Sequence, residues 1–160
     1  MKFLVDANVG KLARLLRMVG YDAALFEGED DRQLVQMALA QGRTLLTKDG
    51  QVFQRRLYKT GRLKALFIER EEPLGQLRQV VQAFRLKYHY RPFSLCLECN
   101  LPLVARSKEE VQALVPPFVY EHQEEFRQCP GCGRLYWKGT HWQKMARLLG
   151  ELAGPQAPSP

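Results

Sequence analysis

Four short apolar runs alternate with amphipathic segments over the first half of the chain, and this alternation constrains the fold more than any other feature. The runs are Phe3-Leu4-Val5, Ala23-Ala24-Leu25-Phe26, Thr44-Leu45-Leu46 and Ala65-Leu66-Phe67-Ile68. Each has the length and apolar character of a buried strand. Strands that alternate with helices form a parallel sheet. The pattern therefore predicts an α/β fold, a parallel sheet with flanking helices.

The segments between the runs carry helix signals. The first has one apolar stripe at helical spacing, made of Leu12, Leu15, Leu16 and Val19. Gly20 suits the left-handed position that ends a helix. Asp30 is a good N-cap for a second helix, which Gly42 ends. Further helices are expected over residues 51–58 and 73–86, which completes four strand–helix units.

Acidic side chains follow the predicted strands. Asp6 comes directly after the first run, Asp49 soon after the third, and Asp30 and Asp31 where the second helix begins. Ligands bind outside the carboxyl ends of parallel strands, so we expect these carboxylates to converge on one edge. Mg²⁺ and Mn²⁺ take hard oxygen ligands and activate water against phosphodiesters. Asn8, two residues after Asp6, is a candidate to orient water or a nucleic-acid ligand.

These acids also have structural interpretations, which the sequence leaves open. Asp30, Asp31 and Asp49 each stand where an N-cap of a helix is expected, and an aspartate there interacts with the helix dipole. Further acids near the strand ends are weaker candidates, namely Glu27, Glu29, Glu69 and Glu71. Asp6 ends a buried strand, which favours a functional role for it.

Positive charge is concentrated in the first part of the chain. The net charge is +7, and residues 1–90 carry 16 Lys and Arg against 10 Asp and Glu. A basic domain with an acidic centre suits a protein that cuts a polyanion, although a solvated basic surface is the alternative. The candidate phosphate-binding residues form two clusters: Lys11, Arg14 and Arg17 on one helix, and Arg55, Arg56, Lys59, Arg62 and Lys64 around the third helix.

All four cysteines lie in two C-x-x-C pairs, Cys96/Cys99 and Cys129/Cys132. Two such turns supply four thiolates for a tetrahedral Zn²⁺, and a site with four protein ligands is structural because no coordination position stays open. Disulfides are the alternative, disfavoured in a cytoplasmic protein. Between the pairs, Ser107 and Glu110 predict a capping box for a short helix. We expect a zinc ribbon over residues 91–152, with Thr140 starting a last helix.

The remaining composition sets the class of protein. Hydrophobic residues make up 46% of the chain, enough for a core, and no apolar run approaches the roughly 18 residues of a membrane span. The acid at position 6 comes too early for a signal peptide, so a cytoplasmic protein without membrane association is expected. The Pro-rich tail, residues 153–160, is expected to be disordered.

Several of these motifs together resemble one known family. They are Val5-Asp6, Gly10-Lys11-Leu12-Ala13-Arg14, Gly20-Tyr21-Asp22, Asp30-Asp31 and Leu46-Thr47-Lys48-Asp49, followed by Cys96-Leu-Glu-Cys99, Cys129-Pro-Gly-Cys132 and Gly139-Thr140-His141-Trp142. The combination is similar to the PIN-like ribonuclease domain with a zinc ribbon found at the C-terminus of Mut-seven-type exonucleases. The similarity extends to about residue 150, and the combination is specific although each short motif is weak.

The resemblance implies a PIN-like domain over residues 1–90 and a metal-dependent RNase centred on Asp6, Asp31 with its neighbour Asp30, and Asp49. PIN nucleases use a further acid, whose identity the sequence leaves open. Asp22 matches the family pattern but lies at the start of a strand, so we interpret it as structural. We expect RNA cleavage with Mg²⁺ or Mn²⁺. The alternatives are a non-catalytic RNA-binding module, ribosome- or tRNA-associated, and a protein-interaction adaptor built on the ribbon.

Overall fold

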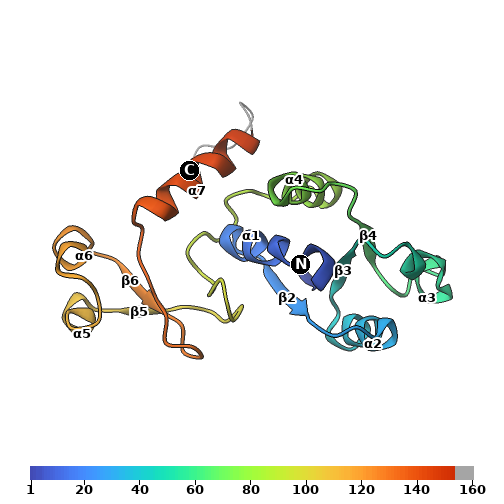
Figure 1. Ribbon diagram of the computed structural model, residues 1–160, viewed down its shortest axis with the longest axis horizontal. Helices are drawn as coiled ribbons and strands as arrows, with labels where there is room; N and C mark the ends of the chain where they lie inside the picture. The colour runs from blue at the N-terminus through green and yellow to red at the C-terminus, as the bar shows by residue number, and fades with distance from the viewer. Residues whose placement is uncertain (154–160) are drawn as a thin grey trace.

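The computed structural model describes residues 1–153 and contains two separate sheets (Figure 1). The first sheet is parallel, as the sequence predicts, with the strand order β2-β1-β3-β4. Its strands are β1 (Lys2–Asp6), β2 (Asp22–Phe26), β3 (Thr44–Thr47) and β4 (Ala65–Phe67). Because β1 lies in the middle, the residue that ends it is flanked by the ends of β2 and β3.

Helices connect these strands on both faces of the sheet. They are α1 (Lys11–Val19), α2 (Asp31–Gln41), α3 (Arg56–Lys59) and α4 (Pro73–Phe84), with the 3-10 turns η1 (Ala7–Val9) and η2 (Gly50–Gln54). The single helix expected over residues 51–58 is wrong. Arg55 has an extended backbone, with φ −70° and ψ 142°, and it separates η2 from α3. The last predicted helix of this unit is two residues shorter than expected, because Arg85 adopts a left-handed conformation.

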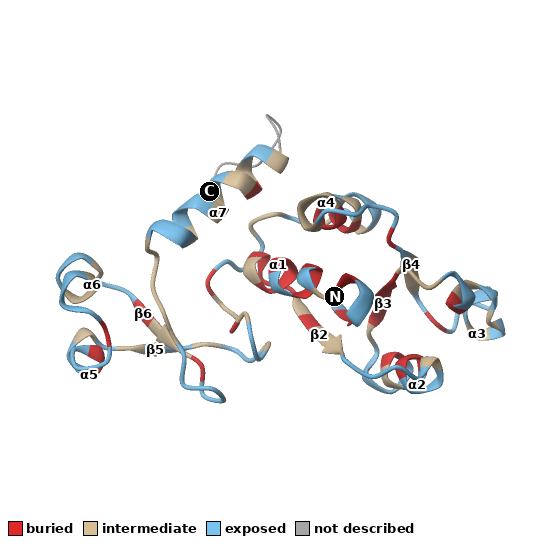
Figure 2. Ribbon diagram, in the orientation of Figure 1, coloured by how far each residue is buried: buried red, intermediate tan, exposed pale blue. Residues whose placement is uncertain are grey.

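The hydrophobic core lies on both faces of the sheet. Successive side chains of a strand point to opposite faces. Accordingly, Phe3 and Val5 pack with α1 and α4, whereas Leu4 packs with Leu34 of α2 on the other face. The three apolar side chains of β1, Phe3, Leu4 and Val5, are fully buried. Figure 2 shows this buried strand-and-helix unit beside a ribbon that is mostly exposed or half-buried.

The second sheet is small and antiparallel, in the order β5-β6-β7. Its strands are β5 (Val104–Arg106), β6 (Phe126–Gln128) and β7 (Leu135–Tyr136), and two short helices, α5 (Lys108–Val111) and α6 (Pro117–His122), lie between β5 and β6. The predicted capping box is confirmed, since Ser107 and Glu110 each bond to the other's backbone N–H. The sequence analysis did not anticipate α6. A core of only three buried side chains, Val111, Val115 and Phe126, supports this unit.

The last helix, α7 (Thr140–Ala153), returns from the ribbon to the parallel sheet (Figure 1). Leu149 is buried in the same cluster as the side chains of α1 and α4, and Met145 and Leu152 pack against it. Ala153, which we assigned to the disordered tail, is the last residue of α7. The rest of that tail lies outside the described residues. No helix within residues 1–153 has the length and apolar content needed to cross a membrane.

Backbone and polar contacts fix the ribbon against the sheet unit. The N–H of Arg91 donates to the carbonyl of Val19 at 3.0 Å, next to the left-handed Gly20. A Cβ atom at Gly20 would lie 2.5 Å from the Arg91 carbonyl oxygen, so only glycine permits this close approach. Nearby, Asp22 accepts hydrogen bonds of 2.6 Å from both Arg43 and Asn100. Asp22 is therefore structural, in agreement with its predicted role.

Candidate active site and metal centre

The carboxyl ends of β1 and β3 place two acids beside one buried hydroxyl group. Thr47, the last residue of β3, donates from Oγ1 to Oδ2 of Asp6 at 2.7 Å. Oγ1 of Thr47 also accepts a 3.0 Å hydrogen bond from the backbone N–H of Asp49. Thr47 is fully buried, which fixes its rotamer. One threonine thus sets the position of Asp6 relative to the segment that carries Asp49.

Asp31, the first residue of α2, lies against this pair. Its pKa is raised, first by burial, then by a hydrogen bond to Asp49 and the charge of Asp49, with a smaller contribution from Asp6. Arg55 acts in the opposite direction, so its guanidinium lies close enough to stabilise the carboxylate. The structure therefore brings Asp6, Asp31 and Asp49 together, although they are 25 and 18 residues apart in the sequence.

Two of the candidate acids also act as helix caps. Asp30 is exposed and accepts a 2.8 Å hydrogen bond from the N–H of Arg32, as an N-cap of α2. Asp49 accepts from the N–H of Gln51 at 2.9 Å and caps η2. Because capping occupies one oxygen of Asp49, its other oxygen remains for Asp31 or a ligand. Asp30 has no such second contact within the described residues, and the geometry favours Asp31.

The three acids suit a hydrated divalent ion. Within residues 1–153, only the cysteines form a group of three or more potential ligands whose atoms all lie within 4.8 Å of one another. The carboxylate oxygens of the three acids are therefore spaced more widely than the ligand atoms of a site that encloses a bare ion. Mg²⁺ keeps several water molecules and is usually held by one or two carboxylates, so this donor set fits it. Besides burial, which is the largest cause, the neighbouring Asp49 and Asp6 raise the pKa of Asp31, and a cation between these carboxylates would offset their repulsion.

A cleft of about 490 Å³ opens beside the start of α1 and contains Asn8, Lys11 and Glu71. Oδ1 of Asn8 accepts a hydrogen bond of 3.3 Å from the N–H of Lys48. The side chain of Lys48 in turn makes a 2.7 Å ion pair with Glu71. Among the weaker acidic candidates, Glu71 is thereby linked to Asn8 and to the segment that follows β3. Glu27, Glu29 and Glu69 are exposed.

The cluster on α1 divides into two kinds of residue. Lys11 is exposed at the cleft. Arg17 is 6% exposed and donates to the carbonyls of Ala23 at 2.8 Å and Leu97 at 2.6 Å, which does not favour its predicted contact with RNA. Arg14 forms an ion pair with Glu98 of the ribbon. Arg14 and Arg17 therefore hold the ribbon against α1.

The second basic cluster is divided between opposite edges of the sheet. Arg55 is half-buried beside Asp31, and Arg56 is exposed at the start of α3. Arg62 and Lys64 precede β4, and in a parallel sheet the residues before a strand lie at the amino edge, away from Asp6. Arg62 and Lys64 therefore do not flank the acidic cleft, although the sequence groups them with Arg55 and Arg56 as candidate phosphate-binding residues.

The four cysteine sulfurs form a compact group that is arranged to hold a metal such as zinc. All four Sγ atoms lie within 4.8 Å of one another, and none forms a disulfide. The Sγ atoms of Cys96 and Cys132 are 3.8 Å apart. A tetrahedron with Zn–S bonds of about 2.3 Å has edges of about 3.8 Å. Hydrogen bonding to Cys132, then burial and the other thiols, raises the pKa of Cys99 to about 12, so four thiolates need a cation between them.

Two residues that sequence reasoning missed support these sites. Thr47 supports the acidic centre, and a hydroxyl at the end of a buried strand, two residues before an aspartate, was the available signal. Tyr136 supports the cysteines: its hydroxyl lies 3.2 Å from Sγ of Cys96 and accepts a 3.1 Å hydrogen bond from the N–H of Leu97. No sequence signal pairs Tyr136 with Cys96, because they are 40 residues apart and only the folding of the ribbon brings them together.

Comparison with known proteins places this combination in a family. No curated protein and no solved structure matches the chain significantly. A family model, the Mut7-C RNAse domain, matches residues 1–149, which include the parallel sheet, the acidic edge and the four-cysteine ribbon. The match covers nearly all of the chain. This chain therefore belongs to the Mut7-C RNAse domain family.

Proposed function

We propose that this protein is a ribonuclease that hydrolyses RNA phosphodiester bonds with Mg²⁺ or Mn²⁺ held by Asp6, Asp31 and Asp49. Membership of an RNase family supports RNA as the substrate class. The observation that carries the proposal is the convergence of three acids that are remote in sequence: Thr47 links Asp6 to the backbone of Asp49, and Asp31 lies against Asp49. A purely structural role does not require Asp31 and Asp49 to face each other.

A divalent metal held by Asp6, Asp31 and Asp49 would polarise a phosphoryl oxygen and activate a water. The residues of the chain position the carboxylates and neutralise the phosphate charge. Thr47 fixes the rotamer of Asp6 by donating to Oδ2, so this carboxylate is presented at the same angle in every turnover. Lys11 lines the cleft and Arg55 lies beside Asp31, which supports a role for both cations in binding phosphates. Asn8, held by the N–H of Lys48, orients water or substrate.

We also propose that the ribbon binds one structural Zn²⁺ through Cys96, Cys99, Cys129 and Cys132. Four thiolate ligands leave no coordination position for substrate, so this zinc does not take part in cleavage. Its function is to fold the ribbon, whose own core is too small to do so alone.

The test compares the wild-type protein with Asp6→Asn. Single-stranded RNA labelled at one end is incubated with each protein, with Mn²⁺ or with a chelator. We expect cleavage only by the wild type and only with the metal. RNA binding by Asp6→Asn is retained or strengthened, because a negative charge that faces phosphate is removed. If the wild type cuts no RNA, or Asp6→Asn cuts equally well, the nuclease proposal fails. RNA binding without cleavage would instead support the binding-module alternative.

A further inference from the structure

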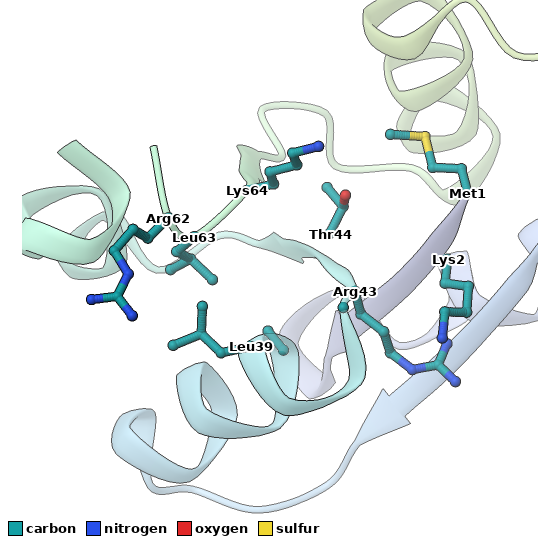
Figure 3. A pocket seen from close by; sticks show the side chains of 10 residues that line it. Met1, Lys2, Leu39, Arg43, Thr44, Arg62, Leu63 and Lys64 are labelled. Atoms are coloured by element: carbon teal, nitrogen blue, oxygen red, sulfur yellow. The ribbon is translucent and has the colours of Figure 1, made fainter. Parts of the chain in front are cut away.

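A second concave surface lies at the amino edge of the sheet, opposite the edge that carries Asp6. It is a cavity of about 330 Å³ between the start of β1, the end of α2 and the segment that leads into β4 (Figure 3). The strand β1 has five residues, and at about 3.3 Å per residue the two edges are roughly 15 Å apart. The cavity is therefore separate from the acidic centre.

The rim of this cavity is cationic. Lys2, Arg43, Arg62 and Lys64 line it, and no Asp or Glu does. Arg43 is already neutralised by Asp22, which also lies within the field of Lys2. In contrast, none of the ion pairs found among residues 1–153 involves Arg62 or Lys64. These two exposed cations are thus available to an anion.

The floor of the cavity is apolar and rigid. Leu63 is buried in the cluster below α2, and its N–H donates to the carbonyl of Leu57 at 2.9 Å. Leu39 of α2 remains 37% exposed, which is unusual for a leucine beside a core. Figure 3 shows Leu39 and Leu63 facing each other next to Arg62, with Lys2 and Arg43 together on the far side. A ligand here meets a cation and an apolar surface at once.

We propose that this cavity is a second RNA-binding site, which takes one nucleotide of the strand beyond the cleavage position. Arg62 and Lys64 bind its phosphate, and Leu39 and Leu63 contact the flat face of its base. A nucleotide combines an anion with an apolar face, as this lining requires, and the proposal rests on the proposed function in taking RNA as the polyanion. An RNA that reaches both edges binds more tightly than one that reaches only the acids.

The test measures binding without cleavage, so it does not depend on nuclease activity. RNAs of increasing length, from about 4 to about 16 nucleotides as in other single-strand sites, are titrated onto Asp6→Asn protein. We expect a step of about tenfold in affinity once the strand spans both edges. Adding Arg62→Gln and Lys64→Gln removes this step and lowers the salt slope for long RNA by about 1.4, or about 0.7 for each phosphate contact. Short RNA binds unchanged.

Matched controls separate the cavity from general charge effects. Lys144→Gln with Arg147→Gln removes the same charge from exposed positions on α7, on the opposite side of the molecule from α2 (Figure 1). We expect this pair to keep the step. Leu39→Gln weakens only long RNA, whereas Leu114→Gln, a 63% exposed leucine of the ribbon, has no effect. Thermal melting of each variant confirms that it is folded.

The same phosphate chemistry also occurs in a free nucleotide, so uridine monophosphate is titrated in parallel. Nucleotide binding that depends on Arg62 and Lys64 but gives no length-dependent step for RNA would overturn the RNA assignment. So would a step that both double variants keep, or that both lose. Failure of the nuclease proposal is recognised separately, by a wild type that cuts no RNA, and it leaves the binding step measurable.

Discussion

Thr47 donates its hydroxyl hydrogen to Oδ2 of Asp6 across two neighbouring strands, at 2.7 Å. The same hydroxyl oxygen accepts the N–H of Asp49. A fully buried threonine has its rotamer fixed by packing, so it transmits the geometry of the sheet to both acids. The acidic edge is thus positioned by a buried residue.

Replacing this hydroxyl tests the positioning role. Thr47→Val keeps the shape of the side chain but removes the donor to Asp6 and the acceptor for Asp49. We expect cleavage to fall by about 10- to 100-fold, as when supporting residues of metal sites are changed. Thr44→Val is the control, because Thr44 is also buried but lies at the amino end of β3. Both variants are assayed on a short RNA that does not reach the cavity lined by Thr44. Equal activity of Thr47→Val and wild type would contradict the positioning role.

A second prediction separates the two adjacent aspartates at the start of α2. Asparagine caps a helix as well as aspartate does, so Asp30→Asn retains the bond to Arg32 and full cleavage. Asp31→Asn removes a carboxylate that faces Asp49 and is expected to reduce cleavage by at least about 100-fold. The rates are compared at saturating Mn²⁺. The reverse order of effects would assign the metal to Asp30 instead.

The sheet and the acidic edge were predictable because both follow from local pattern and chain direction. The apolar runs ended where Asp6 and Asp49 begin, and parallel strands place such residues on one edge. The choice between Asp30 and Asp31 was not predictable from the sequence. Both suit a helix start, and only the contact between Asp31 and Asp49 distinguishes them.

Arg17 shows where local pattern fails. On α1 it lies away from the buried leucines, as a solvent-facing arginine does, and the helix pattern therefore suggested an exposed cation. Its partners, the carbonyls of Leu97 and Glu98, come from the ribbon about 80 residues later. A contact of this kind depends on how the ribbon docks against the sheet, which hydrophobic periodicity does not encode. Arg62 precedes β4, so chain direction was enough to place it at the amino edge, although its spacing from Arg55 and Arg56 suggested a single cluster.

The junction between ribbon and sheet gives a third prediction. Arg17→Met removes a buried donor and leaves carbonyls unpaired, which is expected to reduce the free energy of unfolding by about 2–3 kcal/mol. Arg14→Met disrupts an exposed ion pair and is expected to cost less than about 1 kcal/mol. Denaturant unfolding measures both. If Arg17→Met keeps its stability but lowers the salt slope of RNA binding, Arg17 contacts phosphate after all.

Asp22 gives a pH-dependent prediction. Partial burial opposes its ionisation, but the hydrogen bonds from Arg43 and Asn100 outweigh burial and lower its pKa below the ordinary 3.8. The stabilisation is therefore complete above that value and is lost as the pH falls through the lowered pKa of the folded state. At neutral pH, Asp22→Asn is expected to cost about 1 kcal/mol, because solvent screens this partly exposed carboxylate.

Denaturant unfolding at a series of pH values checks this. The stability curves of wild type and Asp22→Asn are expected to approach each other as the pH falls below 3.8 and to converge below the lowered pKa of the folded state, where the wild-type carboxylate is protonated in both states. Glu27→Gln removes an exposed carboxylate and serves as the control, with a change within about 0.5 kcal/mol. A difference that persists unchanged at low pH would show that the Asp22 charge does not stabilise the fold.

The last prediction concerns the metal of the ribbon. We expect one Zn²⁺ per chain, lost in Cys132→Ser. Tyr136→Phe retains the four thiols but removes the hydroxyl beside Cys96, so it is expected to weaken zinc binding by about 10- to 100-fold. Hydrogen exchange of the zinc-free protein is expected to rise over residues 94–139, which form the ribbon. The core strand β1 stays protected, because its side chains pack within the sheet unit. Metal analysis that finds no zinc, or mapped disulfides between the cysteine pairs, would refute this assignment.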